Sequence, residues 1–171
     1  MNKNNCEFQQ GFDELMTYNR TVFRICLGYA KDPREAEDLA QDTYLKAYLK
    51  LGTLKNPNCR EIKKQWLFKI AKNTCLDHLK KQSRQLLFQS KPQNDPIEHN
   101  TPETLSIQDQ ELSRLKIIIQ KLPKKQQEVF ILKEYGQLSY REIAVSLGIK
   151  EGTVMSRLNR ARQTVIEKMR A

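Results

Sequence analysis

One stretch near the end of the chain limits the possible folds most strongly. Residues 138–162 read LSYREIAVSLGIKEGTVMSRLNRAR. Ser139 and Glu142 have the S-x-x-E spacing of a capping box, in which each side chain bonds the other residue's backbone N–H, so a helix begins there. Gly148 can adopt the left-handed conformation that ends this helix, and a second helix begins near Lys150. The stretch therefore predicts a helix-turn-helix.

The second of these helices has an apolar side and a polar, basic side. Its predicted buried stripe, at helical spacing, consists of Val154, Leu158, Ala161 and Val165. The other faces carry the residues that we predict to contact DNA, namely Met155, Ser156, Arg157, Asn159 and Arg160. Arginine, asparagine and serine supply the donors that phosphates and base edges require. An amphipathic helical hairpin with a solvated basic side is the alternative interpretation.

The distribution of charge also favours a polyanionic partner. The net charge is +10 and the pI is about 9.5. Residues 60–84 hold eight basic and two acidic side chains, and residues 114–171 hold thirteen basic and five acidic ones. Residues 85–113 between them hold one basic and five acidic side chains. Two basic segments joined by an acidic one suggest two DNA contacts and a spacer that DNA repels.

The spacing of apolar residues predicts helices along the rest of the chain and no strand. We expect a first helix up to about Ala30, a second helix that Asp32 caps and Gly52 ends, and a third helix over residues 61–81. The helical pattern resumes near Leu105. The fold class is therefore all-α.

A change in composition divides the chain into two parts. Residues 82–104 are rich in glutamine, serine, asparagine and proline and contain few large apolar residues, which is typical of a flexible linker. The sequence therefore predicts two small helical domains, residues 1–81 and residues 105–171, with the helix-turn-helix in the second.

Several classes of protein and site are disfavoured by the sequence. Membrane insertion is disfavoured because no stretch approaches the roughly 18 uninterrupted apolar residues of a membrane span. The N-terminus lacks the apolar core of a signal peptide, so we expect a cytoplasmic protein. The four cysteines are irregularly spaced without a C-x-x-C pair, and His78 and His99 have no partner at ligand spacing, so we expect no metal and no cofactor. Cys26 and Cys75 fall in apolar helical patterns, where a buried free thiol is the usual state.

Three motifs, taken in order, carry a family resemblance. They are AEDLAQDTYLKAY at residues 36–48, WLFKIAKNTCLDHLKK at residues 66–81, and the segment from LPKKQQEVF through the helix-turn-helix at residues 122–162. Together they resemble the extracytoplasmic-function (ECF) group of bacterial RNA polymerase sigma factors. The resemblance implies a core-polymerase docking helix, a helix that reads the −10 promoter element and a domain that reads the −35 element.

The first motif has a mixed acidic, amide and apolar helix face. Its members, spaced i, i+3, i+4 and i+7, are Asp38, Gln41, Asp42 and Leu45. Such a face suits a helical partner of complementary charge, and a solvated acidic face is the alternative. The resemblance supplies the partner, which is a coiled-coil segment of core RNA polymerase.

The second motif combines a basic face with an amide. Lys69, Lys72 and Asn73 share one side of the predicted helix, and the amide can hydrogen-bond a base edge. In the family, this face and the preceding loop read the non-template strand and capture a flipped base, which offsets the cost of unstacking. Asn56 and Asn58 are the candidate polar contacts from that loop. Trp66, by contrast, we expect to pack in the core.

The helix-turn-helix departs from the family pattern at two positions. Met155 stands where a basic residue is common, and an apolar contact with a thymine methyl is one replacement for the lost contact. Lys150 stands where a serine or proline often begins the recognition helix, so the cap is poor. A nearby DNA phosphate would offset that disadvantage.

The predicted function is that of an ECF sigma factor, which performs no covalent chemistry of its own. The resemblance implies core RNA polymerase and promoter DNA as partners, together with an anti-sigma factor that is often attached to the membrane. The main alternative is a stand-alone helix-turn-helix regulator, which leaves the first two motifs without a purpose. A nuclease or recombinase would need clustered carboxylates with a metal, or a nucleophile beside arginines. Tyr140 lies next to Arg141, but we expect it to be a packing residue.

Overall fold

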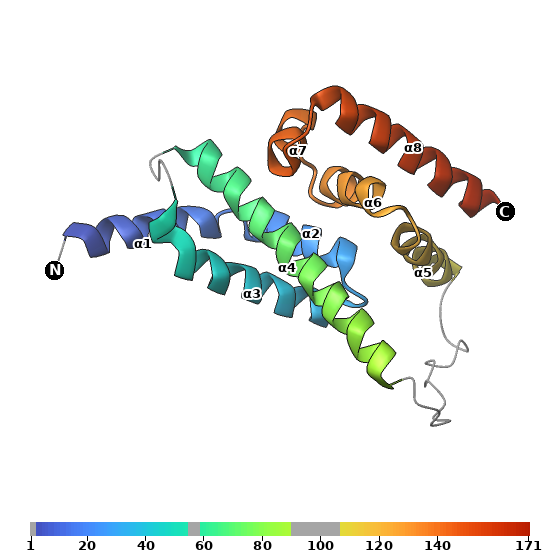
Figure 1. Ribbon diagram of the computed structural model, residues 1–171, viewed down its shortest axis with the longest axis horizontal. Coiled ribbons are helices and arrows are strands. Elements are labelled where there is room, and N and C mark those ends of the chain that lie inside the picture. The colour runs from blue at the N-terminus through green and yellow to red at the C-terminus, as the bar shows by residue number, and fades with distance from the viewer. Residues whose placement is uncertain (1–2, 55–58, 90–106) are drawn as a thin grey trace.

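The structure is a computed structural model that describes residues 3–54, 59–89 and 107–171, and every regular element in these residues is helical (Figure 1). The absence of strands from this part of the chain agrees with the predicted all-α class. The α-helices are α1 (Lys3–Met16), α2 (Asn19–Tyr29), α3 (Pro33–Lys50), α4 (Arg60–Gln89), α5 (Ile107–Gln120), α6 (Lys124–Phe130), α7 (Tyr140–Leu147) and α8 (Glu151–Arg170). A 3-10 turn, η1 (Leu51–Thr53), follows α3, and a π-helical turn, η3 (Ile131–Tyr135), follows α6.

Two helix boundaries differ from the sequence prediction. The predicted first helix is two helices, because the chain turns after Met16, where the Thr17 hydroxyl donates to the carbonyl of Glu14 at 2.7 Å. The third helix continues eight residues beyond Lys81, to Gln89. Residues 82–89 of the predicted linker are therefore helical, since they contain neither glycine nor proline to end the helix. The rest of the predicted linker, residues 90–104, lies outside the described residues.

The N-terminal half is built on α2, α3 and α4. The start of α3 is fixed as predicted, since the Asp32 carboxylate accepts the backbone N–H of Glu35 at 2.9 Å and Pro33 occupies the first turn. Helices α2 and α4 are in contact, and their buried side chains, such as Ile25 and Phe68, belong to the same apolar core. Burial of this apolar surface positions α3 and α4 so that each keeps one face open to solvent.

The helix-turn-helix forms as predicted. Ser139 accepts the backbone N–H of Glu142 at 3.2 Å, and Glu142 accepts the backbone N–H of Ser139 at 2.7 Å, which completes the capping box. Gly148 ends α7 with a φ of 65°, a conformation that strongly favours glycine. The turn directs α8 across α6 and α7, where its apolar stripe is buried.

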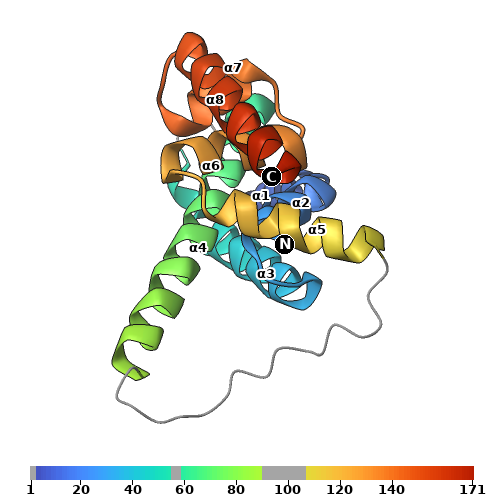
Figure 2. The ribbon, with the colours of Figure 1, turned by 90° about the vertical axis from the view of Figure 1, so that its right-hand side faces the viewer.

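The two halves pack against each other through one continuous core, which the sequence did not predict. Buried side chains of both halves belong to the same cluster. A Cβ built on Gly28 of α2 would lie 2.6 Å from Cγ2 of Ile131 in η3, so only glycine fits there without a shift. Figures 1 and 2 show α6 and α7 beside the N-terminal helices, with α7 against the first turns of α4.

An ion pair crosses this contact between the halves. Lys64 of α4 donates to the carboxylate of Glu142, the same carboxylate that caps α7. Partial burial by itself favours the neutral acid, but the hydrogen bonds from Lys64 and Ser139 outweigh it and hold the pKa of Glu142 below its ordinary value. The Lys64 ammonium shows the reciprocal effect, since its hydrogen bond to Glu142 raises its pKa.

This ion pair predicts a specific loss of stability in acid. Because the pKa of Glu142 is lower in the folded state, its contribution is complete above the unfolded-state pKa and disappears as the pH falls through the folded-state value. We expect Glu142→Gln to lower the free energy of unfolding by about 1–2 kcal/mol at pH 7, and the deficit to shrink below about pH 4. Urea titrations at pH 7, 5 and 3.5 measure the free energy of unfolding of the wild-type protein and the variant. Glu167→Gln, at an exposed position on α8, is the control, and a deficit that is the same at all three pH values would contradict the prediction.

Candidate nucleic-acid interface

Helix α8, the second helix of the helix-turn-helix, buries its predicted apolar stripe and leaves most of the predicted DNA-contact residues exposed. Val154, Leu158 and Ala161 are almost completely buried, and Val165 is 8% exposed. The opposite side is open to solvent: Met155 is 54% exposed, Ser156, Asn159 and Arg160 are exposed, and Arg157 is half-buried. Several of these side chains line a shallow hollow between α7 and the start of α8, together with Tyr140 and Gly152. The helix therefore offers a mixed apolar and polar face for a partner.

The two arginines at the middle of α8 differ in their availability. The Arg162 guanidinium donates to Oε1 of Glu134 from Nε at 3.0 Å and from Nη2 at 2.6 Å, and this hydrogen bonding raises its pKa further. Among the described residues, Arg160 has no acidic partner of this kind. Arg160 is therefore the arginine whose donors remain open for a phosphate or a base.

The start of α8 has the weak cap that the sequence predicted. Lys150 is the N-cap residue and makes no side-chain capping hydrogen bond. The first backbone N–H groups of α8 therefore point outward without a side-chain acceptor from the cap. They are suited to an anion, since a helix N-terminus attracts negative charge.

The predicted −10 face lies on the middle of α4. Lys69 and Asn73 are exposed and Lys72 is half-buried, while Leu67 and Ala71 on the other side are buried. Trp66 is half-buried and packs against the core, as predicted. The loop residues Asn56 and Asn58 lie outside the described residues.

Not all of the positive charge on α4 is free for a partner. Lys63 is 5% exposed and pairs with Glu14, and Lys64 pairs with Glu142. The nearby Arg60 donates from Nε to the Tyr18 hydroxyl at 3.1 Å and remains largely exposed. The beginning of α4 thus uses its lysines to hold the fold, and the free basic face begins at Lys69.

The predicted docking face on α3 is exposed and is larger than predicted. Asp38, Gln41 and Asp42 are exposed, and Leu45 is 58% exposed. Further along α3, Tyr48 is 46% exposed and Leu49 is 71% exposed. The reason is that α1 covers this end of α3 only partly, through edge-to-face contacts of Phe8 and Phe12 with the Tyr48 ring.

A groove lies beside this face. It is lined by the apolar side chains Met16, Phe23, Ala40 and Tyr44 and by the polar side chains Asn19, Arg20, Glu37 and Gln41. Gln41 therefore belongs both to the predicted docking face and to the groove. The sequence could not reveal the groove, since its residues come from the end of α1 and from two further helices.

Three side chains that are distant in the sequence form a hydrogen-bonded cluster between α3 and α4. His78 of α4 lies 2.7 Å from Oε1 of Glu35 at the start of α3, a pairing between residues 43 positions apart that the sequence spacing did not reveal. Gln82 donates to the same oxygen at 2.6 Å. Burial of Glu35 favours its neutral form, but hydrogen bonds from the Lys31 backbone, His78 and Gln82 lower its pKa. This cluster ties α3 to α4 from residues 43 and 47 positions apart in sequence.

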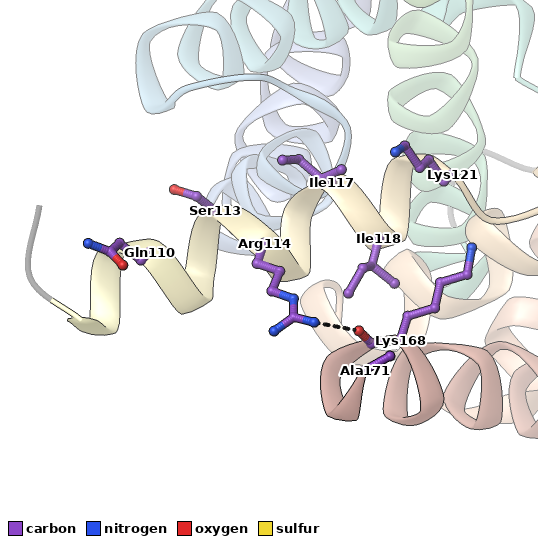
Figure 3. Close-up of a pocket in the computed structure, with 8 residues that line it drawn as sticks. All are labelled: Gln110, Ser113, Arg114, Ile117, Ile118, Lys121, Lys168 and Ala171. Atoms are coloured by element: carbon purple, nitrogen blue, oxygen red, sulfur yellow. Dashed lines mark hydrogen bonds between the residues drawn. The ribbon is translucent and has the colours of Figure 1, made fainter. Parts of the chain in front are cut away.

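A second groove lies between α5 and α8, away from the predicted DNA-reading residues (Figure 3). Arg114 spans it and donates to the carbonyl of Lys168 at 3.1 Å. Ile117, at 52% exposure, and Ile118 line its α5 side.

Residues 3–54, 59–89 and 107–171 contain neither a cluster of metal ligands nor a helix that could span a membrane. In these ranges, no group of three or more histidine, cysteine, aspartate and glutamate side chains is arranged to hold a metal ion. No helix there is both long enough and apolar enough to cross a membrane.

Comparison with known protein families matches both halves of the chain. Residues 15–85 match the model of sigma-70 region 2, and residues 113–165 match the model of sigma-70 region 4. The first match contains α2, α3 and most of α4, and the second contains the helix-turn-helix. The chain belongs to the sigma-70 family. Members of this family are in general not enzymes.

Curated relatives place this sigma factor in the ECF group. It is 29% identical to the RNA polymerase sigma-H factor of Pseudomonas aeruginosa over 169 residues, which covers 92% of the chain and 85% of the relative. It is 28% identical to the ECF RNA polymerase sigma factor SigM of Bacillus subtilis, covering 88% of the chain and 90% of the relative. The sigma factor RpoE of Bartonella quintana, solved in complex with the anti-sigma factor NepR, superposes with a TM-score of 0.67 at 25% identity, over 93% of this chain and 96% of that one. The alternative of a stand-alone regulator is not favoured by these matches.

Proposed function

We propose that this sigma factor binds core RNA polymerase through α3, reads the −35 promoter element as duplex DNA through α8 and reads the −10 element as separated strand through α4. One observation carries the proposal. The chain exposes two DNA-compatible helix faces and one acidic, apolar face, and the three lie on the helices that correspond to sigma-70 regions 2 and 4.

The proposed −35 contact rests on the exposed side of α8. Arg160 has free donors for a guanine edge or a phosphate, and Asn159 and Ser156 lie beside it. Arg157 stands at the edge of this face and suits a phosphate contact. Met155 offers no charge but is well placed for a thymine methyl, and a DNA phosphate at Lys150 would complete the weakly capped start of the helix.

The proposed −10 contact rests on Lys69, Lys72 and Asn73 of α4. The lysines attract the backbone of a single strand, and the Asn73 amide can both donate to and accept from a base edge. Asn56 and Asn58, in the loop that precedes α4, are the proposed wall of a pocket for a flipped base. Such a pocket would offset the cost of unstacking that base.

The proposed polymerase contact combines Asp38, Gln41, Asp42 and Leu45 with the exposed Tyr48. Carboxylates around an exposed leucine suit a basic, partly apolar helix, because opposite charge speeds the encounter and apolar burial supplies affinity. Residues 1–81 and 105–171 are the two proposed functional units. The joining segment, residues 82–104, begins within α4.

An anti-sigma factor is the further partner that we propose. Two solved relatives of similar fold are complexes with regulatory partners, RpoE with the anti-sigma factor NepR and CnrH with the cytosolic domain of CnrY. CnrH is 21% identical and has a TM-score of 0.65. By analogy, an anti-sigma protein, attached to the membrane or not, would bind this chain in the bacterial cytoplasm.

Run-off transcription with core polymerase on a promoter library tests the proposed function. We expect transcripts from a subset of promoters that share an upstream and a downstream element, and none from core polymerase alone. Core binding without any promoter-specific transcript would overturn the proposal. Failure of the chain to bind core polymerase in a pull-down, with duplex DNA binding intact, would instead favour a stand-alone regulator.

A further inference from the structure

Two cysteines from distant parts of the chain lie side by side in the N-terminal half. Cys26 of α2 and Cys75 of α4 are 49 residues apart in sequence, and their sulfur atoms are 3.7 Å apart. Both are free thiols with no exposed surface, and the Cys75 S–H points toward the Cys26 sulfur. Each thiol thus has the other sulfur as its nearest reactive group.

In the part of the chain that the structure describes, the surroundings of the two cysteines do not form a metal site and keep the pair buried. No third metal-ligating side chain joins the two sulfurs within the described residues, whereas a structural zinc site needs four ligands. The hydrogen bond to Cys26 and burial both raise the pKa of Cys75, which favours the neutral thiol form of Cys75. The neighbouring Tyr29 is also buried, and its hydroxyl has no hydrogen-bond partner.

We propose that Cys26 and Cys75 are a modification site, a dithiol that oxidises to a disulfide between α2 and α4. A disulfide has a sulfur–sulfur distance of about 2.05 Å, so the atoms must approach by roughly 1.7 Å. Small rotations about the side-chain bonds and a slight shift of two packed helices supply a movement of that size. In a reducing compartment the thiol form is the resting state, and the disulfide forms under oxidation.

The chemistry needs an external oxidant, which a small organic disulfide supplies. A thiolate formed during transient opening attacks the reagent, which makes a mixed disulfide and releases one reagent thiolate. The second cysteine thiolate attacks the sulfur of the first, forms the Cys26–Cys75 bond and releases the second reagent thiolate. The two protons of the protein thiols end on the two released reagent thiols. The protein loses two electrons and two protons, and the reagent gains them.

The disulfide has a mechanical consequence for the fold. It closes a loop that contains all of α3, the helix with the proposed polymerase-docking face, and so restricts the unfolded chain. Gly28, which contacts the C-terminal half, lies only two residues from Cys26. We therefore expect the oxidised protein to melt roughly 10 °C higher than the reduced protein.

Native oxidation of the full chain tests the proposal. The protein is incubated with hydroxyethyl disulfide, alkylated to block remaining thiols, digested with trypsin without reduction and analysed by mass spectrometry. We expect the peptides ICLGYAK and NTCLDHLK to be joined, with a mass 2 Da below their sum, and the higher melting temperature to be reversed by dithiothreitol. The joined peptides should form more slowly than the mixed disulfide at the exposed Cys59.

Single variants separate this pair from other thiol chemistry. Cys59→Ser should keep the joined peptides and the rise in melting temperature, whereas Cys26→Ala and Cys75→Ala should each lose both. The mapping on the wild-type chain needs no variant, so a poorly folding variant does not weaken the test. Recovery of Cys26 and Cys75 as free thiols, or each bound only to the reagent, after Cys59 has reacted fully would overturn the proposal.

Discussion

Gly28→Val is expected to weaken the contact between the two halves of the protein by about 3 kcal/mol. A Cβ at this position would lie 2.6 Å from Cγ2 and 3.2 Å from Cγ1 of Ile131, and 3.2 Å from Cγ of Tyr135. Both neighbours belong to η3 and not to α2's own half. The overlap therefore falls on the contact between the halves, and the helix that carries the valine can itself form.

Two measurements follow the effect of this substitution. Urea unfolding should show the lost stability, and small-angle X-ray scattering should show a larger radius of gyration because the halves separate. Gly52→Val is the matched control, since a Cβ on Gly52 meets nothing within 4 Å. Equal unfolding free energies and equal radii for the two variants would mean that the halves do not pack in solution as described.

Arg160→Ala and Asn73→Ala are expected to weaken the recognition of different promoter elements. Loss of one good contact to a base edge costs about 1–3 kcal/mol, so each variant should lose roughly 10–100-fold of its discrimination at one element. Arg160→Ala should make transcription insensitive to changes in the −35 element and leave sensitivity to the −10 element. Asn73→Ala should do the reverse, because its amide faces the strand that α4 is proposed to read.

Run-off transcription on promoters altered at one element at a time measures both effects. Gln163→Ala on α8 and Asp77→Ala on α4 are the matched controls, since both side chains are exposed on the same helices. If the two variants exchange their effects, or if neither differs from its control, then the assigned roles of Arg160 and Asn73 are wrong.

The elements that the sequence predicted well are those whose signals are local. The capping box at Ser139 and Glu142, the positive φ of Gly148 and the buried stripe of α8 each depend on residues within a few turns of one helix. The exposure of the candidate DNA residues on α8 follows from the same periodicity. Their roles in promoter reading remain predictions that the variants above address.

The features that the sequence did not predict depend on where helices meet. Lys64 and Glu142 are 78 residues apart, and each looks like a solvated charge in its own segment. Gly28 lies inside a helix and not at a turn, so the sequence did not indicate its role, which is to allow η3 to approach α2 closely. The end of α4 differs for another reason: the polar composition of residues 82–89 predicts a linker, but each of these residues is compatible with a helix, and α4 continues to Gln89.

The contact of α4 with α7 bears on how readily this sigma factor engages a promoter. Elements centred near −35 and −10 are about 25 base pairs apart, or roughly 85 Å at 3.4 Å per base pair. With α7 packed against α4, the proposed −35 reader α8 and the proposed −10 reader α4 lie too close together to occupy both elements at once. On these proposed roles, we expect only molecules whose halves have parted to be competent, so that the apparent affinity for a promoter is the intrinsic affinity reduced by the fraction of such molecules. Substitutions that loosen the contact would therefore trade folding stability for promoter occupancy.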